Sequence, residues 1–309
     1  MATTLIEIPG GRAIEGPLES NGYPLNTAPD RIGWLKPTDP SRSMEELREQ
    51  YWQDGYLWLK GILDRDEVLE FRGRHFERLR ETGLIKEGTD PVDGIYSGGP
   101  VNSEAVMKAK HEIVRWAAYE AFCLAKPILR FFEEFFGSAV YLHKRKIIRF
   151  NEPFKTNCTG AHYDLVYLRG GTDNLCTAWI PIGDTPVEMG GLVYLEGSDA
   201  AGRRLEAEFA KQRATLPPEE RVKAFNKYMN SGWLGKDLNA IADKLGGRWL
   251  VADYEAGDMM VHSPYIVHAA TRNVDREGRI RLSTDIRYQR VYDEIDTRWE
   301  NHWSADDGL

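Results

Sequence analysis

The sequence has few cysteines, no long apolar run and no long run of basic residues. Cysteine occurs three times in 309 residues, at Cys123, Cys158 and Cys176, so we expect neither a disulfide framework nor a cysteine-rich zinc site. This scarcity favours a reducing compartment, and we expect a cytoplasmic protein. No apolar run reaches the roughly 18 residues that span a bilayer, and the N-terminal residues lack the basic and apolar regions of a signal peptide. We therefore expect no membrane partner.

The charge balance is acidic, which argues against polyanionic partners. Lys and Arg number 40 and Asp and Glu number 48, giving a net charge of −8, so nucleic acid is not an expected partner. Hydrophobic residues make up 42% and charged residues 28%, a globular composition that excludes a disordered, collagen-like or coiled-coil chain. A chain of this length buries a full core. A small molecule is the expected partner, and composition leaves the oligomeric state open.

The first part of the chain is predicted to be an arm followed by helices. Residues 1–42 contain many Gly, Pro and Ser without a sustained period, which predicts an irregular arm. Residues 43–137 are predicted to form a helical buttress. Ser43 is expected to cap its first helix, and a second helix is expected from Asp64 to Gly83. A long helical stretch, interrupted near its proline, is expected over residues 103–136.

The second part of the chain consists of short strand-like segments separated by Gly, Pro and Asp. This pattern predicts a jelly-roll core over residues 138–292. The charged segment at about 202–246 is predicted to be a helical insertion, of a length that usually serves as a lid or binding element. Residues 293–309 are expected to be a C-terminal tail. We expect residues 1–309 to form one domain of the α+β, mainly β class.

Two of the seven histidines lie near a carboxylate in the β-rich part. His162 and Asp164 form an H-x-D in a predicted strand, and residues i and i+2 of a strand point to the same face. A third ligand must come from a distant strand, where His268 fits and His262 is the competing candidate. Two imidazoles and one carboxylate on one face leave coordination positions open, as in the facial triad of non-haem Fe(II) oxygenases.

A candidate anion-binding arginine follows His268 in the sequence. Arg279 lies eleven residues after His268, about the length of a turn plus a strand. A guanidinium there can hold a carboxylate in bidentate geometry, and 2-oxoglutarate ends in such a carboxylate. Arg281 lies on the same face of the predicted strand and is the rival anchor. An H-x-D is common by chance, so the joint pattern carries the inference.

Several longer motifs extend the pattern over residues 50 to 290. In order, they are QDGYLWLKGILDRDEV, GAHYDLVYL, TAWIPIGDTPVEMGGLVYLEGS, GDMMVHSPYIVHAATRN and RLSTDIRYQ. In these motifs the sequence resembles the phytanoyl-CoA dioxygenase family of Fe(II)- and 2-oxoglutarate-dependent oxygenases. The resemblance implies a double-stranded β-helix, cupin-like core in a single catalytic domain. It also implies Fe(II), 2-oxoglutarate as cosubstrate, and O2.

The resemblance also implies roles for individual residues. Arg279 would pair with the distal carboxylate of 2-oxoglutarate, Trp179 would line the cosubstrate pocket, and Thr177 would hydrogen-bond the cosubstrate. His268 is preferred over His262 because Arg279 then keeps the family's spacing. The implied Fe(II) ligands, which are also the catalytic residues, are His162, Asp164 and His268.

The implied reaction is oxidation of an unactivated C–H bond, with release of succinate and CO2, by hydroxylation or by desaturation or cyclisation. Aromatic candidates for the substrate pocket favour a small, largely apolar metabolite; they are Tyr96, Tyr167, Tyr194, Tyr228 and Trp233. The HKRK run at His143–Lys146 is expected to be a solvated strand edge, with contact to a phosphate or CoA group as the alternative. Three alternatives stay open: an acyl-CoA hydroxylase of the same mechanism, a cupin-type metal oxygenase or isomerase without 2-oxoglutarate, and a non-catalytic binding module.

Overall fold

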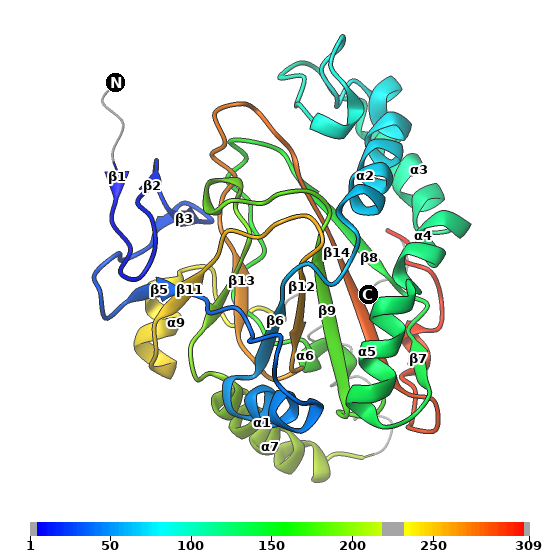
Figure 1. The fold of residues 1–309 in the computed structure, drawn as a ribbon. Coiled ribbons are helices and arrows are strands. Elements are labelled where there is room, and N and C mark those ends of the chain that lie inside the picture. Colours follow the sequence, from blue (N-terminus) through cyan, green and yellow to red (C-terminus); the bar gives the residue numbers. More distant parts are fainter. Residues whose placement is uncertain (1–4, 218–231, 306–309) are drawn as a thin grey trace.

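Two mainly antiparallel sheets face each other in the computed structural model, which describes residues 5–217 and 232–305 (Figure 1). The larger sheet has the order β6-β12-β9-β14-β7, with β8 also paired to β14. Its strands are β6 (Tyr56–Leu59), β7 (Val140–Leu142), β8 (Ile147–Asn151), β9 (Leu175–Pro181), β12 (Met259–His262) and β14 (Arg281–Arg290). The smaller sheet has the order β13-β10-β11-β5. Its strands are β5 (Ile32–Trp34), β10 (Leu192–Leu195), β11 (Trp249–Val251) and β13 (His268–Ala270). The predicted double-stranded β-helix core is confirmed.

The central strands β9 and β14 separate an apolar outer face from a polar inner face. Ala178, Ile180 and Ile286 lie in the core cluster shared with the helices. The alternate positions turn to the other face, between the two sheets. There Trp179 pairs with Asp285 and Thr177 pairs with Arg287. This alternation places a row of polar β14 side chains inside the core.

Helices cover the outer face of the larger sheet (Figure 1). They are α1 (Met44–Asp54), α2 (Arg65–Leu79), α3 (Ser103–Ile113), α4 (Ala117–Cys123) and α5 (Lys126–Phe136). Ser43 caps α1 as predicted, in a capping box with Glu46. The helical stretch predicted over residues 103–136 is interrupted near Pro127 as expected, because α5 begins at Lys126 after Ala125. A second interruption was not predicted: Trp116 is extended and starts α4. Pro127 lies in the first turn of α5, where its missing N–H costs nothing.

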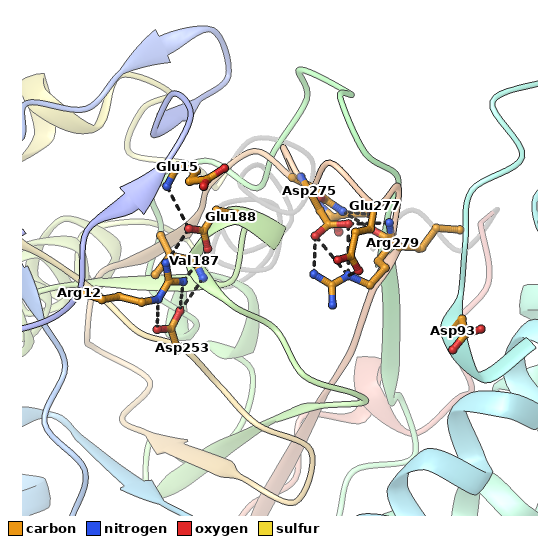
Figure 2. Close-up of polar contacts among 12 residues, drawn as sticks. Arg12, Glu15, Asp93, Val187, Glu188, Asp253, Asp275, Glu277 and Arg279 are labelled. Carbon is orange, nitrogen blue, oxygen red and sulfur yellow. Dashed lines mark hydrogen bonds and ion pairs between the residues drawn. The ribbon is translucent and has the colours of Figure 1, made fainter. Parts of the chain in front are cut away.

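The N-terminal arm is more ordered than predicted. Its short strands are β1 (Leu5–Ile6), β2 (Ile14–Glu15), β3 (Glu19–Ser20) and β4 (Tyr23–Pro24), and β5 joins the smaller sheet parallel to β11. Three residues are too few to show a period, so the sequence did not reveal β5. Arg12 fastens the arm to the core through Glu188, at 2.6 Å, and Asp253, at 2.7 Å (Figure 2).

The insertion begins with α7 (Asp199–Ala214) and ends with α9 (Leu238–Leu245). Part of the predicted helical segment lies at 218–231, outside the described residues. The remaining short elements are α6 (Leu165–Leu168) and the 3-10 turns η1 (Arg80–Thr82), η2 (Pro91–Asp93), η3 (Val187–Met189) and η4 (Thr297–Trp299). Over the described part of the chain, no helix has both the length and the apolar character to cross a bilayer.

The core also contains a histidine whose burial makes stability depend on pH. His75 is fully buried, and neither ring nitrogen has a hydrogen-bond partner among the described residues. Burial, aided by the Arg72 charge, lowers the pKa of His75 to about 3. In the unfolded chain His75 is protonated below about pH 6.5, whereas in the folded protein it stays neutral down to about pH 3. The contribution of His75 to the free energy of unfolding is therefore complete above about pH 6.5. It decreases as the pH falls toward 3, by about 1.4 kcal/mol per pH unit.

We predict that His75→Phe makes the free energy of unfolding less dependent on pH between 6.5 and 4. The non-titrating ring removes the proton uptake of the unfolded state at this position. Urea unfolding at several pH values measures the effect. Phe132→Leu is the control, since it removes buried apolar volume and should destabilise equally at every pH. A wild-type pH slope retained in His75→Phe would contradict the prediction.

Candidate metal centre

Three buried side chains converge between the two sheets. His162, Asp164 and His268 place one ligand atom each within 4.8 Å of one another. Nε2 of His162 lies 3.7 Å from Oδ1 of Asp164, and Nε2 of His268 lies 3.6 Å from the same oxygen. The structure thus brings together the three residues that the H-x-D pattern and the distant histidine indicated.

Backbone pairing fixes both imidazoles. His162 and His268 exchange two N–H···O hydrogen bonds of 3.0 and 2.9 Å as an antiparallel bridge. Their Nδ1 atoms lie 2.9 and 3.1 Å from the carbonyl oxygens of Gly160 and Ile266. Because a carbonyl only accepts, each Nδ1 carries the proton and each Nε2 presents its lone pair toward Asp164. Both rings are therefore in the tautomer that binds a metal through Nε2.

Asp164 reaches the site in a different way from the one predicted. The strand expected over GAHYDLVYL stops after the bridge at His162, and Asp164 has helical dihedrals (φ −66°, ψ −31°) at the start of α6. A strand-to-helix turn, not strand alternation, brings its carboxylate to the imidazoles. Tyr163 turns away and donates to Glu206 of α7 at 2.6 Å. The insertion helix is thereby attached to the segment that carries two of the three converging residues.

The burial of the site sets its protonation. Burial lowers the pKa of His162, and burial together with the other imidazoles holds the pKa of His268 well below its usual range. Burial acts to raise the pKa of Asp164, but the Arg287 guanidinium and the imidazoles outweigh it and hold that pKa well below the usual value. At neutral pH the site therefore presents two neutral imidazoles and one carboxylate, the protonation that metal binding requires.

Thr177 and His262 lie on the far side of the Asp164 carboxylate. Thr177 was expected to contact the cosubstrate, but its hydroxyl donates to Oδ2 of Asp164 at 2.5 Å. Nε2 of His262 lies 3.5 Å from the same Oδ2, and its Nδ1 lies 2.9 Å from the Tyr194 hydroxyl. His268, not His262, belongs to the converging set of ligand atoms. Thr177 and His262 are cross-strand neighbours on β9 and β12, a register that the sequence does not reveal.

The two candidate anchor arginines have different surroundings. Arg279 is held at 2.6 Å by Asp275 and at 3.3 Å by Glu277, and its side chain is 35% exposed (Figure 2). Arg281 is 2% exposed, donates to Oδ1 of Asn151 at 2.6 Å, and has no partner for Nε and Nη1 among the described residues. The guanidinium predicted as anchor is already neutralised by carboxylates, whereas the rival guanidinium is buried without one.

Trp179 lies on the inner face of β9, one alternation from Thr177. Its ring is buried against Tyr254, with ring centroids 4.7 Å apart, in an apolar cluster between the sheets. Its cross-strand neighbour is Asp285 on β14. The position borders the interior where a cosubstrate would lie, and its role stays a prediction.

The donor set fits ferrous iron. Two imidazole nitrogens and one carboxylate oxygen on one side of a point leave the other side open, as in non-haem Fe(II) oxygenases and unlike closed structural zinc sites. Arg281, buried and not ion-paired with any carboxylate among the described residues, lies on the same inner face, as a dicarboxylate cosubstrate requires. Fold and site together define a mononuclear iron oxygenase of the jelly-roll class.

Comparison with known proteins agrees with this class. The sequence model of the phytanoyl-CoA dioxygenase (PhyH) family matches residues 51–280. The 1-deoxypentalenic acid 11-beta-hydroxylase of Streptomyces exfoliatus is 26% identical over 253 residues, covering 79% of this chain and 81% of the relative. The corresponding hydroxylase of Streptomyces arenae is 25% identical, with the same coverage. The chain belongs to the PhyH family and is an Fe(II)- and 2-oxoglutarate-dependent oxygenase.

Solved structures with the same fold include two enzymes described as non-heme and alpha ketoglutarate dependent, both from nogalamycin biosynthesis. The carbocyclase SnoK superposes with a TM-score of 0.54 at 19% identity, covering 89% of this chain and 92% of its own. The epimerase SnoN, in complex with Fe3+, alpha ketoglutarate and nogalamycin RO, superposes with a TM-score of 0.53 at 19% identity, covering 83% and 87%. At this identity the likeness shows the fold.

We predict that His162→Ala or Asp164→Ala abolishes binding of one equivalent of Fe(II), because each change removes one of the three side chains expected to bind it. Anaerobic titration followed by measurement of retained iron tests this. His111→Ala, on α3 outside the site, is the control and should keep the wild-type stoichiometry. Full retention of iron by both site variants would show that the metal is bound elsewhere.

Proposed function

We propose that this protein oxidises an unactivated C–H bond of a small, largely apolar metabolite, with His162, Asp164 and His268 as iron ligands and Arg281 as the anchor of 2-oxoglutarate. With 2-oxoglutarate and O2, the bound iron would supply the oxidation of the C–H bond, with release of succinate and CO2. The observation that carries the proposal is the buried, unneutralised Arg281 guanidinium on the same inner face as the side chains around the triad.

The surroundings of Arg281 call for an anion. Burial lowers the pKa of Arg281 to about 10, which still leaves the side chain charged at neutral pH. The charge of Asp285 favours protonated Arg281, but no described carboxylate forms an ion pair with it. A buried charge without an ion-pair partner is costly, and a bound carboxylate would reduce that cost. The buried hydroxyl of Ser283, two residues along the same face of β14, also has no hydrogen-bond partner among the described residues. Arg281 and Ser283 together offer donors for the distal carboxylate of 2-oxoglutarate.

The other residues of the interior hold the Asp164 carboxylate or border the space for cosubstrate and substrate. Thr177 and Arg287 fix the Asp164 carboxylate, and Trp179 would wall one side of the cosubstrate and exclude water. Tyr167 has its ring centroid 5.7 Å from that of His162. Tyr194 lies at a similar distance from His268, with ring centroids 5.9 Å apart, but its side chain is fully buried. Tyr167 is partly exposed, and we assign it to the substrate side.

The end of the insertion also lies against the metal-binding segment. Leu234 donates to the carbonyl of Ala161 at 2.7 Å, and Ala161 donates to the carbonyl of Gly235 at 2.9 Å. A Cβ on Gly160 would come within 2.7 Å of the Trp233 ring, so this glycine permits close packing. We therefore assign Trp233 to the substrate side as well.

The remaining aromatic candidates are not assigned to the substrate side. Tyr194 is fully buried behind His262, and Tyr96 packs against the helical side of the core. Tyr228 lies outside the described residues. Neither Tyr194 nor Tyr96 is assigned to substrate binding.

The basic run gives no support to a CoA thioester substrate. The expectation of a solvated strand edge is wrong, because His143, Arg145 and Lys146 are each at most 2% exposed. Lys146 is paired with Glu120, and Arg145 lies over the ring of Trp299. With these side chains buried, we favour a free small molecule. By their printed names, the two Streptomyces relatives are hydroxylases of 1-deoxypentalenic acid, SnoK is a carbocyclase and SnoN is an epimerase. Hydroxylation is therefore the proposed outcome and cyclisation the alternative.

We predict that Arg281→Ala weakens 2-oxoglutarate binding, raising its Kd at least about tenfold, since a buried charged hydrogen bond to the distal carboxylate contributes about 1.5–3 kcal/mol. The visible charge-transfer band of the anaerobic Fe(II)–2-oxoglutarate complex measures binding without knowledge of the substrate. Arg279→Ala is the matched control and should bind 2-oxoglutarate like the wild type. The reverse ranking would restore Arg279 as the anchor. Absence of the band in the wild type would contradict 2-oxoglutarate dependence itself.

A further inference from the structure

The two oxygens of Asp164 have separate surroundings. Oδ1 is the oxygen nearest to both imidazoles, at 3.7 Å from His162 and 3.6 Å from His268. Oδ2 accepts from the hydroxyl of Thr177 at 2.5 Å and from Nη2 of Arg287 at 3.2 Å. Nε2 of His262 lies 3.5 Å from Oδ2. One oxygen therefore faces the ligand set, and three side chains from three different strands surround the other.

We infer that Arg287 and His262 are positioning residues that hold Asp164 as a metal ligand through Oδ1 alone. This inference rests on the proposed metal centre and goes beyond it, because it assigns roles to two residues outside the ligand set. Oδ2, engaged by its own donors, is kept from the metal. A carboxylate that binds through one oxygen leaves one more coordination position open than one that binds through two. Those open positions are what the cosubstrate and O2 require.

Tyr194 sets the direction in which His262 donates. The hydroxyl of Tyr194 lies 2.9 Å from Nδ1 of His262, and both side chains are fully buried. Among the described residues no acceptor other than Nδ1 is recorded for this hydroxyl, so the hydroxyl proton points to Nδ1. A neutral imidazole that accepts at Nδ1 carries its proton on Nε2. That N–H lies on the side of Oδ2 of Asp164, at an Nε2–Oδ2 distance of 3.5 Å. Nε2 has no hydrogen-bond partner in the described part of the chain, so this carboxylate oxygen is the acceptor nearest to hand.

The C-terminal segment supports Arg287. The guanidinium carbon of Arg287 lies 5.0 Å from the ring centroid of Trp299, a cation–π distance. Trp299 is 3% exposed, and its indole N–H donates to the carbonyl of Tyr167 at 3.2 Å. The backbone N–H of Arg145 donates to the carbonyl of Trp299 at 3.1 Å. Residues 297–299 were expected to be part of a tail, but they hold in place the guanidinium that contacts the Asp164 carboxylate.

Co(II) titration of the full-length wild type and of single variants tests the inference. The visible Co(II) spectrum reports the ligand set without any turnover. The variants are Arg287→Met and His262→Leu, which keep most of the side-chain volume but remove the donors. Arg287→Lys retains the charge and serves if Arg287→Met fails to fold. Tyr194→Phe removes only the hydroxyl that orients His262. Arg145→Met is the matched control, since it removes the other guanidinium stacked on Trp299 without touching Asp164.

We expect Arg287→Met and His262→Leu each to weaken Co(II) binding about 10–100-fold, the usual loss when a group that orients a ligand is removed. We also expect a changed Co(II) visible spectrum in both, and in Tyr194→Phe, because Oδ2 is freed to bind the metal. Arg145→Met should keep the wild-type affinity and spectrum. A variant that merely loosens the fold would lower the melting temperature of the metal-free protein without altering the spectrum of the bound metal.

Wild-type affinity and spectrum in both Arg287→Met and His262→Leu would overturn the inference and leave the metal centre intact. Failure of the metal centre has a different signature, because His162→Ala would then bind Co(II) like the wild type. That result would overturn the proposed ligands and this inference together. The two failures are therefore distinguished in the same set of titrations.

Discussion

A buried carboxylate, Asp164, is the group on which the rest of the site depends. Burial opposes its negative charge, and the Arg287 guanidinium with the surrounding donors keeps it ionised. Each of these partners comes from a different element: Thr177 from β9, Arg287 from β14 and His262 from β12. The pairing of these strands therefore also brings together the side chains that surround the Asp164 carboxylate. A shift in register would break the carboxylate's neutralisation along with the hydrogen-bond ladder.

The two faces of β14 carry different kinds of side chain. Its outer residues, such as Ile286 and Tyr288, pack against the helices. Its inner residues are polar: Arg287 contacts the carboxylate, while Arg281 and Ser283 have donors without a partner in the described part of the chain. The helical side therefore stabilises the strand whose opposite face holds the polar groups of the site. In this way a single element links the core to the chemistry.

The sequence predicted the three converging side chains because His162 and Asp164 form a local H-x-D and because the family resemblance favoured His268 over His262. It does not reveal the contacts of other residues where the tertiary structure decides. Spacing favoured Arg279, yet Asp275 and Glu277 in the preceding turn neutralise it. Thr177 contacts Asp164 because of a register between strands, which no single sequence shows. The basic run at His143–Lys146 is buried partly because a distant C-terminal tryptophan covers Arg145. Local patterns predict elements and donor sets, whereas pairing and coverage depend on the whole fold.

A crystal structure of the complex with Fe(II) and 2-oxoglutarate, grown without O2, tests the central claim most directly. We expect the metal on Nε2 of His162, Oδ1 of Asp164 and Nε2 of His268, with the distal carboxylate of 2-oxoglutarate against Arg281. A metal bound by His262, or by both oxygens of Asp164, would contradict the account.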